Sequence, residues 1–423
     1  MSLHYILGRA GQGKTRLVMN EIKYYLDNGD DPLILLVPEQ YTLQAERDLM
    51  EKLELPGIMQ VEVLSFTRMA SRIFNDVGGL TRTLLNEQGK NMILRRVINQ
   101  NRHKLTIFKP AALQDGFVLK CSEIIAEMKQ YNISPADLLD KMTAIETKST
   151  LYMKLNDIAV IYEEMAKYLS GHYLDMEDYI NFFIEKLEES SYFRESRIWM
   201  DNFTTISPQS LRVVEKLMQH CREFSISLTI APPEESKDKD LFTISTRCLR
   251  KIKEMAAVLG IKEEVIWVAH NDSQLRKSPE IIHLEKQLYV FPGRKYDEKP
   301  EHIHLFASSN MVMEVENLAA QIVALARDNE LRWNQMAVIC QDIGNYGPLI
   351  KRVFNEYDIP YFMDEKREIV DHPLIQFILA SLDLIQRNYR YEDLARYCRT
   401  GFTFLDDGAC DILENYLLRY GIK

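Results

Sequence analysis

The feature that most constrains the fold lies within the first fifteen residues. Eight consecutive residues fit the pattern G-x-x-x-x-G-K-[ST], and they are Gly8, Arg9, Ala10, Gly11, Gln12, Gly13, Lys14 and Thr15. The apolar run 4–7 before them predicts a strand, and apolar residues at helical spacing across 16–26 predict a helix. Because glycines let backbone N–H groups face an anion at the start of a helix, this context predicts a phosphate-binding P-loop.

The last two residues of the motif are candidates for direct nucleotide contacts. Lys14 is placed to reach the β- and γ-phosphates of ATP, and Thr15 to put its hydroxyl on Mg²⁺. The alternative is an accidental glycine turn, which at ordinary glycine frequency gives a match about once per hundred chains of this size. The matching flanks favour nucleotide binding.

Composition bounds the class of protein. With 423 residues the chain is too long for one ordinary core, so we expect two or three domains. The hydrophobic content of 46% and charged content of 27% are typical of globular proteins. No apolar run approaches the length of a membrane span, and no basic-then-apolar leader begins the chain. We therefore expect a cytoplasmic protein without a membrane partner.

Cysteine spacing and charge exclude other classes. The six cysteines include no C-x-x-C pair, so we expect buried free thiols rather than a zinc or iron–sulfur site in this chain. The net charge of −10 argues against a uniformly basic nucleic-acid surface. Residues 82–104 nevertheless hold six Lys or Arg against one Glu. This stretch is either a solvated helix face or a surface that follows phosphates.

Strand–helix alternation predicts an α/β fold with a parallel sheet. The apolar run 33–37 is typical of a strand buried on both faces. Further strands are expected at 61–64, 197–201, 224–230 and 264–268, and helices at 42–53, 68–76, from 207 onward and 242–259. Such a sheet binds ligands at the carboxyl ends of its strands.

The pattern divides the chain into domains. Residues 84–190 have helical spacing with almost no strand signal, which predicts an all-helical insertion in a P-loop domain made of 1–83 and 191–290. Within the insertion, Ser134 and Pro135 predict the start of a new helix. The charged run 234–240 is expected to be an exposed loop.

A second α/β lobe is expected at 300–423. Its strands are predicted at 303–307, 336–340 and 360–362, and its helices at 312–327, 346–357, 374–386 and 391–398. The series stops at Lys423 with the lobe unfinished, which indicates a fragment of a longer protein.

Asp201 is the expected second half of the nucleotide site. It ends an apolar strand, and beside the strand that feeds the P-loop its carboxylate can hold Mg²⁺ directly or through water; a turn or capping Asp is the alternative. The next residue is Asn202, which cannot accept a proton from water. Since general-base action contributes about 10²- to 10⁴-fold, we expect weak hydrolysis unless Glu39, at another strand end, substitutes. No catalytic residue is assigned.

The order of these segments resembles superfamily 1 helicases of the UvrD type. Within that group, segments 8–15, 36–40, 63–68 and 201–204 are most similar to the AddB (RexB) family, the second subunit of the AddAB ATP-dependent helicase–nuclease. The resemblance implies a RecA-like P-loop domain followed by the beginning of a second RecA-like lobe. It also implies contacts with single-stranded DNA from Pro38, Gln40, Ser65, Phe66, Thr67 and Arg68.

The resemblance also implies a function. It points to processing of DNA double-strand-break ends for recombinational repair, with ATP, Mg²⁺, the single strand at a duplex end and a helicase–nuclease subunit of the AddA type as partners. The helicase segment that carries an arginine to the phosphates has Gln341 or Asp342 here. The nuclease domain and the iron–sulfur cluster of the family are expected only beyond Lys423.

Three alternatives stay open at this stage. They are an active superfamily 1 translocase, a P-loop kinase for a small molecule, and a non-enzymatic module with a vestigial P-loop. The adenine pocket has no clear marker, because Tyr5, Tyr41 and Phe66 could each stack a base but are each more typical of a core.

Overall fold

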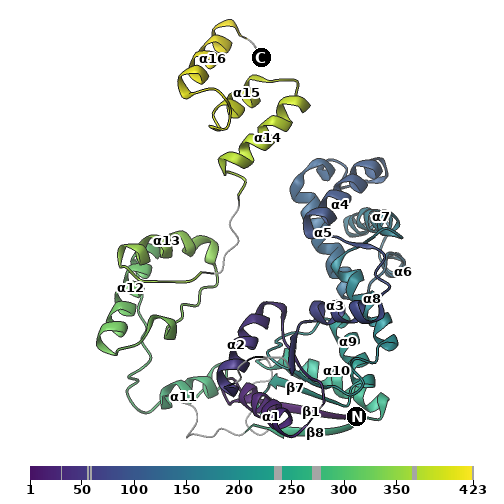
Figure 1. Cartoon of the computed structure of the whole chain (residues 1–423), viewed down its shortest axis with the longest axis vertical. Helices are drawn as coiled ribbons and strands as arrows, with labels where there is room; N and C mark the ends of the chain where they lie inside the picture. Colours follow the sequence, from purple (N-terminus) through teal and green to yellow (C-terminus); the bar gives the residue numbers. More distant parts are fainter. Residues whose placement is uncertain are drawn as a thin grey trace. The chain divides into compact units, whose positions relative to one another are not determined.

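A computed structural model describes residues 1–29, 31–54, 57, 60–232, 241–268, 278–363 and 369–421. The chain forms two compact units, Met1–His304 and Leu305–Lys423 (Figure 1). The predicted loop 234–240 lies outside the described residues. In the described portion, every helix is too short or too polar to cross a membrane.

The first unit is built on a parallel sheet of six strands in the order β3-β2-β6-β7-β1-β8. The strands are β1 (Ser2–Gly8), β2 (Leu33–Leu36), β3 (Val61–Leu64), β6 (Arg197–Met200), β7 (Glu223–Thr229) and β8 (Lys262–Trp267). The predicted α/β fold with a parallel sheet is therefore confirmed. The expected adjacency of the Asp201 strand and the P-loop strand is wrong, because β7 pairs with both and separates them.

Side-chain alternation along the strands directs two sets of residues to opposite faces. Ile6, Leu35 and Trp199 pack in the core beneath α1 (Lys14–Asn28) and α2 (Thr42–Leu53). Tyr5 and Met200 pack on the other face. That face is covered by α3 (Phe66–Val77), α8 (Met176–Lys186), α9 (Pro208–His220) and α10 (Thr243–Leu259). A further helix, α11 (Pro279–Gln287), follows β8 in sequence and was not predicted.

Helix starts follow local cap chemistry. Ser134 caps its helix and forms a reciprocal capping box with Asp137, which confirms the predicted start there. The helix predicted from Ser207-Pro208 begins at Pro208, with the Ser207 side chain as cap. The helix expected from residue 68 begins two residues earlier, because the Ser65 hydroxyl accepts a hydrogen bond from the Arg68 N–H at 3.2 Å.

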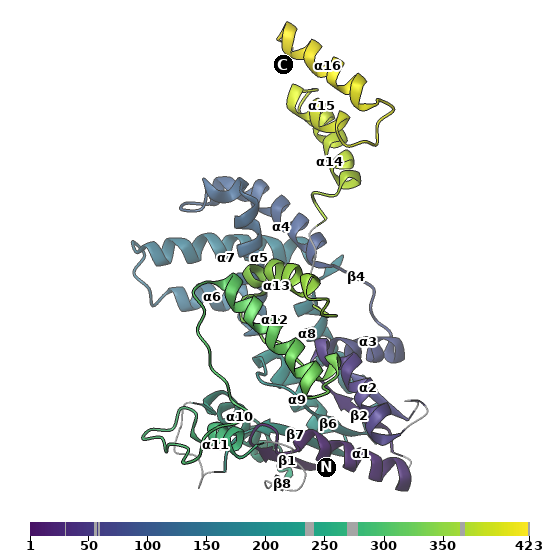
Figure 2. The same ribbon diagram turned by 90° about the vertical axis from the view of Figure 1, so that its left-hand side faces the viewer.

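The helical stretch confirms the expected lack of strands apart from a short ribbon. Its elements are β4 (Thr83–Leu84), α4 (Glu87–Asn101), α5 (Asp115–Gln130), α6 (Pro135–Met142), α7 (Thr150–Leu169) and β5 (Tyr173–Leu174). In both views α8 and α9 lie between these helices and the sheet (Figure 1, Figure 2). Tyr179 and Phe183 of α8 pack in the sheet core, although α8 lies within the proposed insertion 84–190. The domain boundaries stay a prediction.

The basic stretch 82–104 is largely engaged inside this unit. Lys90 is buried and its Nζ lies 3.3 Å from a Glu177 carboxylate oxygen. Lys104 pairs with Glu164 at 3.2 Å, and the Arg96 guanidinium lies over the Tyr168 ring. Several of its positive charges therefore serve packing and pairing within the protein.

The second unit is helical over the residues described. Its helices are α12 (Met311–Asp328), α13 (Ile343–Glu356), α14 (Pro373–Gln386), α15 (Tyr391–Cys398) and α16 (Asp407–Tyr420). The strands predicted at 303–307, 336–340 and 360–362 are wrong for this structure. A strand needs a neighbouring ladder, and the apolar side chains Leu305, Ile339 and Phe362 are almost fully exposed instead.

Candidate nucleotide-binding site

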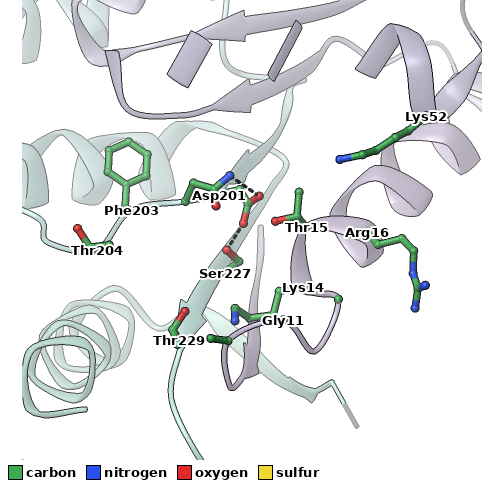
Figure 3. A pocket seen from close by; sticks show the side chains of 13 residues that line it. Gly11, Lys14, Thr15, Arg16, Lys52, Asp201, Phe203, Thr204, Ser227 and Thr229 are labelled. Carbon is green, nitrogen blue, oxygen red and sulfur yellow. Dashed lines mark hydrogen bonds between the residues drawn. The ribbon is translucent and has the colours of Figure 1, made fainter. Parts of the chain in front are cut away.

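A cavity of about 530 Å³ lies at the carboxyl ends of β1, β6 and β7 (Figure 3). It is lined by Ala10, Gly11, Gly13, Lys14, Thr15, Arg16, Lys52, Asp201, Asn202, Phe203, Thr204, Ser227 and Thr229. Parallel strands end at one edge of a sheet, and ligands of such sheets bind there. The structure thus brings the P-loop and Asp201, far apart in sequence, to one cavity.

The loop backbone is shaped by glycine. Gly13 is the N-cap of α1 with φ of 94°, in the left-handed region that favours glycine, and it has no side chain with which to cap the helix. No acidic residue lies in the first turn of α1. The positive end of the helix dipole is therefore not neutralised locally, which favours an anion at the cavity.

Lys14 spans the loop from the first turn of α1. Its Nζ donates hydrogen bonds to the carbonyl oxygens of Gly8 and Arg9, both at 2.9 Å. These bonds hold the ammonium over the loop, where Figure 3 shows it at the cavity. A phosphate oxygen offers a charged acceptor in place of a neutral carbonyl, and charge-assisted hydrogen bonds are about twice as strong.

Three of the predicted ATP-binding residues hold the loop rather than line the cavity. Arg9 is 4% exposed, and its Nε donates to Glu285 of α11 at 2.7 Å. Gln12 accepts a hydrogen bond from the Arg9 N–H at 2.7 Å through its side-chain oxygen. A Cβ on Gly8 would lie 2.7 Å from that same oxygen, so the position requires glycine. The other five predicted loop residues line the cavity.

Asp201 follows β6 on the same side of the sheet as α1. Its side chain is buried, at 2% exposed, and one carboxylate oxygen accepts a hydrogen bond from Ser227 on β7. The Asn202 amide donates to the other oxygen at 3.3 Å. Figure 3 shows Asp201 close to Thr15. Both residues offer hard oxygen ligands of the kind Mg²⁺ prefers, and Mg²⁺ usually takes only one or two protein ligands beside phosphate and water.

No larger metal centre is present among the residues that the structure describes. Groups of three or more His, Cys, Asp or Glu side chains suited to a metal do not occur there. All six cysteines are free, and all except Cys340 are buried, as expected. Burial raises the pKa of Cys121 and Cys221 to about 12, so these thiols stay protonated and unreactive.

Asn202 lines the cavity where an acidic residue would serve as general base. Its φ of 64° lies in the left-handed region, which Asn tolerates better than most residues. Glu39, the possible substitute, is exposed after β2 and does not line the cavity.

Six lining residues were not among the predicted site residues: Arg16, Lys52, Phe203, Thr204, Ser227 and Thr229. Ser227 and Thr229 are polar positions in an otherwise apolar strand, which is a signal available from sequence. Phe203 and Thr204 directly follow the predicted carboxylate. Lys52 lies at the end of α2, and nothing in its local sequence distinguishes it from an ordinary surface lysine.

The two segments predicted to contact DNA lie side by side. They follow the paired strands β2 and β3, and the Val37 N–H donates to the Leu64 carbonyl at 3.0 Å. Gln40 and Arg68 are exposed, whereas Ser65 is 1% exposed and caps α3. The Arg68 guanidinium pairs with Glu46 of α2 at 2.8 Å. Pro38, Phe66 and Thr67 are partly buried.

The candidate aromatic residues take different places. Tyr5 is fully buried in the sheet core, so it is unavailable to stack a base. Tyr41 is partly buried against the core beneath α1 and α2. Phe66 packs on Phe203. The position of an adenine ring stays unassigned.

Comparisons with known proteins agree with one another. A family model described as "ADDB, N-terminal" matches residues 5–285. The whole chain aligns with proteins that carry the name of the AddB subunit of an ATP-dependent helicase/deoxyribonuclease. It is 44% identical to those of Alkaliphilus metalliredigens and Alkaliphilus oremlandii and 38% identical to that of Clostridium kluyveri. The chain spans 37% of the length of each of these relatives.

Proposed function

Because the chain belongs to the AddB N-terminal family, we propose that it acts as the N-terminal part of the AddB subunit of an ATP-dependent helicase/deoxyribonuclease. The role of its RecA-like first unit is to bind ATP with Mg²⁺. One observation carries this proposal: the P-loop and the buried Asp201 line the same cavity at the carboxyl edge of the sheet.

The triphosphate lies along the loop in this proposal. Backbone N–H groups at the start of α1 and the Lys14 ammonium bind its oxygens, and Lys14 exchanges its carbonyl partners for phosphate. Thr15 and Asp201 hold Mg²⁺, which neutralises phosphate charge when bound. Ser227 keeps the Asp201 carboxylate oriented through its hydrogen bond.

Hydrolysis by this chain is slow in the same proposal. Asn202 donates a hydrogen bond to Asp201 and lines the cavity, but an amide cannot take a proton from water. General-base action is worth about 10²- to 10⁴-fold, so its loss leaves binding intact while turnover falls. The nucleotide then serves to hold a conformation rather than to drive movement.

DNA and a second subunit complete the assignment. The exposed Gln40 and Arg68 lie at the sheet edge beside the cavity wall and contact the single strand at a duplex end. The partner is a helicase–nuclease subunit of the AddA type, and the assembly processes broken DNA ends for recombinational repair in the cytoplasm. Nuclease chemistry and an iron–sulfur cluster belong to parts of the relatives that this chain does not span.

Calorimetric titration with Mg·ATP tests the proposal, together with an assay of ATP turnover with and without single-stranded DNA. We expect Lys14→Ala to weaken ATP binding about 10- to 100-fold, the range of one or two lost charged hydrogen bonds. Lys23→Ala, an exposed lysine of α1 outside the cavity, is the matched control and should bind as wild type. Fast DNA-stimulated turnover would instead indicate an active translocase, and absent binding a vestigial loop.

A further inference from the structure

Lys52 is a cation at the nucleotide cavity that the P-loop motif does not include. It comes from the last turn of α2, and it lines the cavity together with Thr15 and Asp201. Figure 3 shows its side chain extending from α2 toward the space beside Thr15. We propose that Lys52 binds the terminal phosphate of ATP and so distinguishes ATP from ADP. This inference rests on the proposed nucleotide site and deepens it.

The placement of Lys52 assigns it to the phosphate end. In a P-loop the Thr hydroxyl and the strand-end carboxylate meet Mg²⁺ at the β- and γ-phosphates. Lys52 shares the cavity with these two groups. Tyr41 shows their proximity independently: burial raises the pKa of its hydroxyl first, and the charges of Asp48, Lys52 and Asp201 all act on it. The ammonium therefore lies near the metal end of the site.

The contacts that Lys52 makes now are easily exchanged. Its Nζ pairs with Asp48 one turn earlier on α2 at 2.6 Å, and its side chain is 50% exposed. Exposed pairs of this kind contribute little to stability. Asp48 also accepts a hydrogen bond from the Gln44 amide at 2.7 Å, so it keeps a partner when Lys52 turns to a phosphate.

Charge balance gives the contact a purpose. The described residues at 336–340 include no arginine that could reach a phosphate, and Gln341 and Asp342 follow them. Lys52 supplies a positive charge from the first unit itself. Because ADP lacks the terminal phosphate, a cation at this place favours ATP selectively, whereas Lys14 serves both nucleotides.

Titration calorimetry with Mg·ADP and the non-hydrolysable Mg·AMPPNP tests the inference. We expect Lys52→Ala to weaken AMPPNP binding about tenfold and to leave ADP binding within about twofold, as for one charged hydrogen bond. Lys52→Arg should restore the preference for AMPPNP. Asp48→Asn, which removes the competing carboxylate, should strengthen AMPPNP binding. Lys23→Ala is the matched control, and thermal melting verifies that each variant is folded.

The outcomes separate this inference from the proposed function. If Lys14→Ala weakens both nucleotides while Lys52→Ala changes neither, or changes both equally, Lys52 has no role at the terminal phosphate and the nucleotide site stands. If the wild-type chain binds neither nucleotide, both the inference and the proposed function are overturned.

Discussion

The ring of Phe203, in the wall of the nucleotide cavity, lies 5.5 Å from the ring of Phe66 at the start of α3. Phe203 follows the carboxylate of Asp201 by two residues, and Phe66 belongs to the segment expected to contact DNA. Aromatic pairs at this separation contribute about 0.5–1.5 kcal/mol beyond their buried area. The contact gives the two proposed sites a direct mechanical connection.

Replacing Phe203 by Ala should therefore reduce the effect of ATP on DNA affinity. We expect the ratio of single-strand affinities with and without Mg·ATP to move toward one, while ATP binding itself changes less. Fluorescence anisotropy with a labelled oligonucleotide measures this ratio. Phe117→Ala, in the Phe108–Phe117 ring pair of the helical stretch, is the matched control. An unchanged ratio in Phe203→Ala would show that the ring pair transmits nothing.

Asn202→Glu tests whether the missing carboxylate limits hydrolysis. We expect ATP turnover to rise at least about tenfold over a slow baseline, because a positioned general base contributes about 10²-fold or more. The left-handed φ of 64° should make Glu less favourable than Asn by about 1 kcal/mol, which thermal melting detects. Asn202→Gln has the length of the Glu side chain without the charge. If turnover in both variants equals that of wild type, the absence of a base at this position is not what slows the reaction.

Lys129 supports a buried ion-pair network between α5 and α8. It is 7% exposed, and its Nζ lies 2.6 Å from carboxylate oxygens of both Asp175 and Asp178. Burial alone would lower the pKa of Lys129, but the two carboxylates outweigh it and the pKa is raised. Lys129→Met should cost about 3–5 kcal/mol of unfolding free energy, because it leaves buried carboxylates without a partner.

Denaturant unfolding of the chain measures this cost. Lys120→Met is the control, since Lys120 pairs with Glu123 at 2.6 Å on the surface of the same helix, where such pairs contribute up to about 1 kcal/mol. Equal losses in the two variants would mean that burial adds nothing to the Lys129 network.

Glu280 should make stability fall in acid. Backbone N–H groups, its own first, and the His302 ring donate to its carboxylate and hold its pKa at about 2. A lowered folded-state pKa contributes stability above the unfolded value of about 4.3, and that stability is lost as pH falls toward about 2. The melting temperature of Glu280→Gln should thus lie below that of wild type at pH 7, and the gap should narrow between about pH 5 and pH 3. Glu301→Gln should show no such narrowing, and a constant gap for Glu280→Gln would refute the assignment.

Local patterns were sufficient for much of the first unit. The apolar runs at β2 and β6, the caps at Ser134 and Ser207, and the glycine loop before Lys14 each depend on residues close in sequence. Propensity, burial pattern and capping act over a few residues, so they can be predicted without knowing the fold. The strands expected at 303–307, 336–340 and 360–362 failed for the complementary reason, since a strand also depends on a partner elsewhere.

The sequence by itself determined that a P-loop precedes a helix, that Asp201 ends a buried strand, and that Asn202 replaces an acidic neighbour. Only the tertiary structure decided that β7 separates the strands of these two motifs and contributes Ser227. It also decided that Arg9 holds α11 instead of facing the cavity, and that Lys52 faces it. Those outcomes depend on strand order and helix packing, which bring together residues far apart along the chain and leave no mark on local spacing.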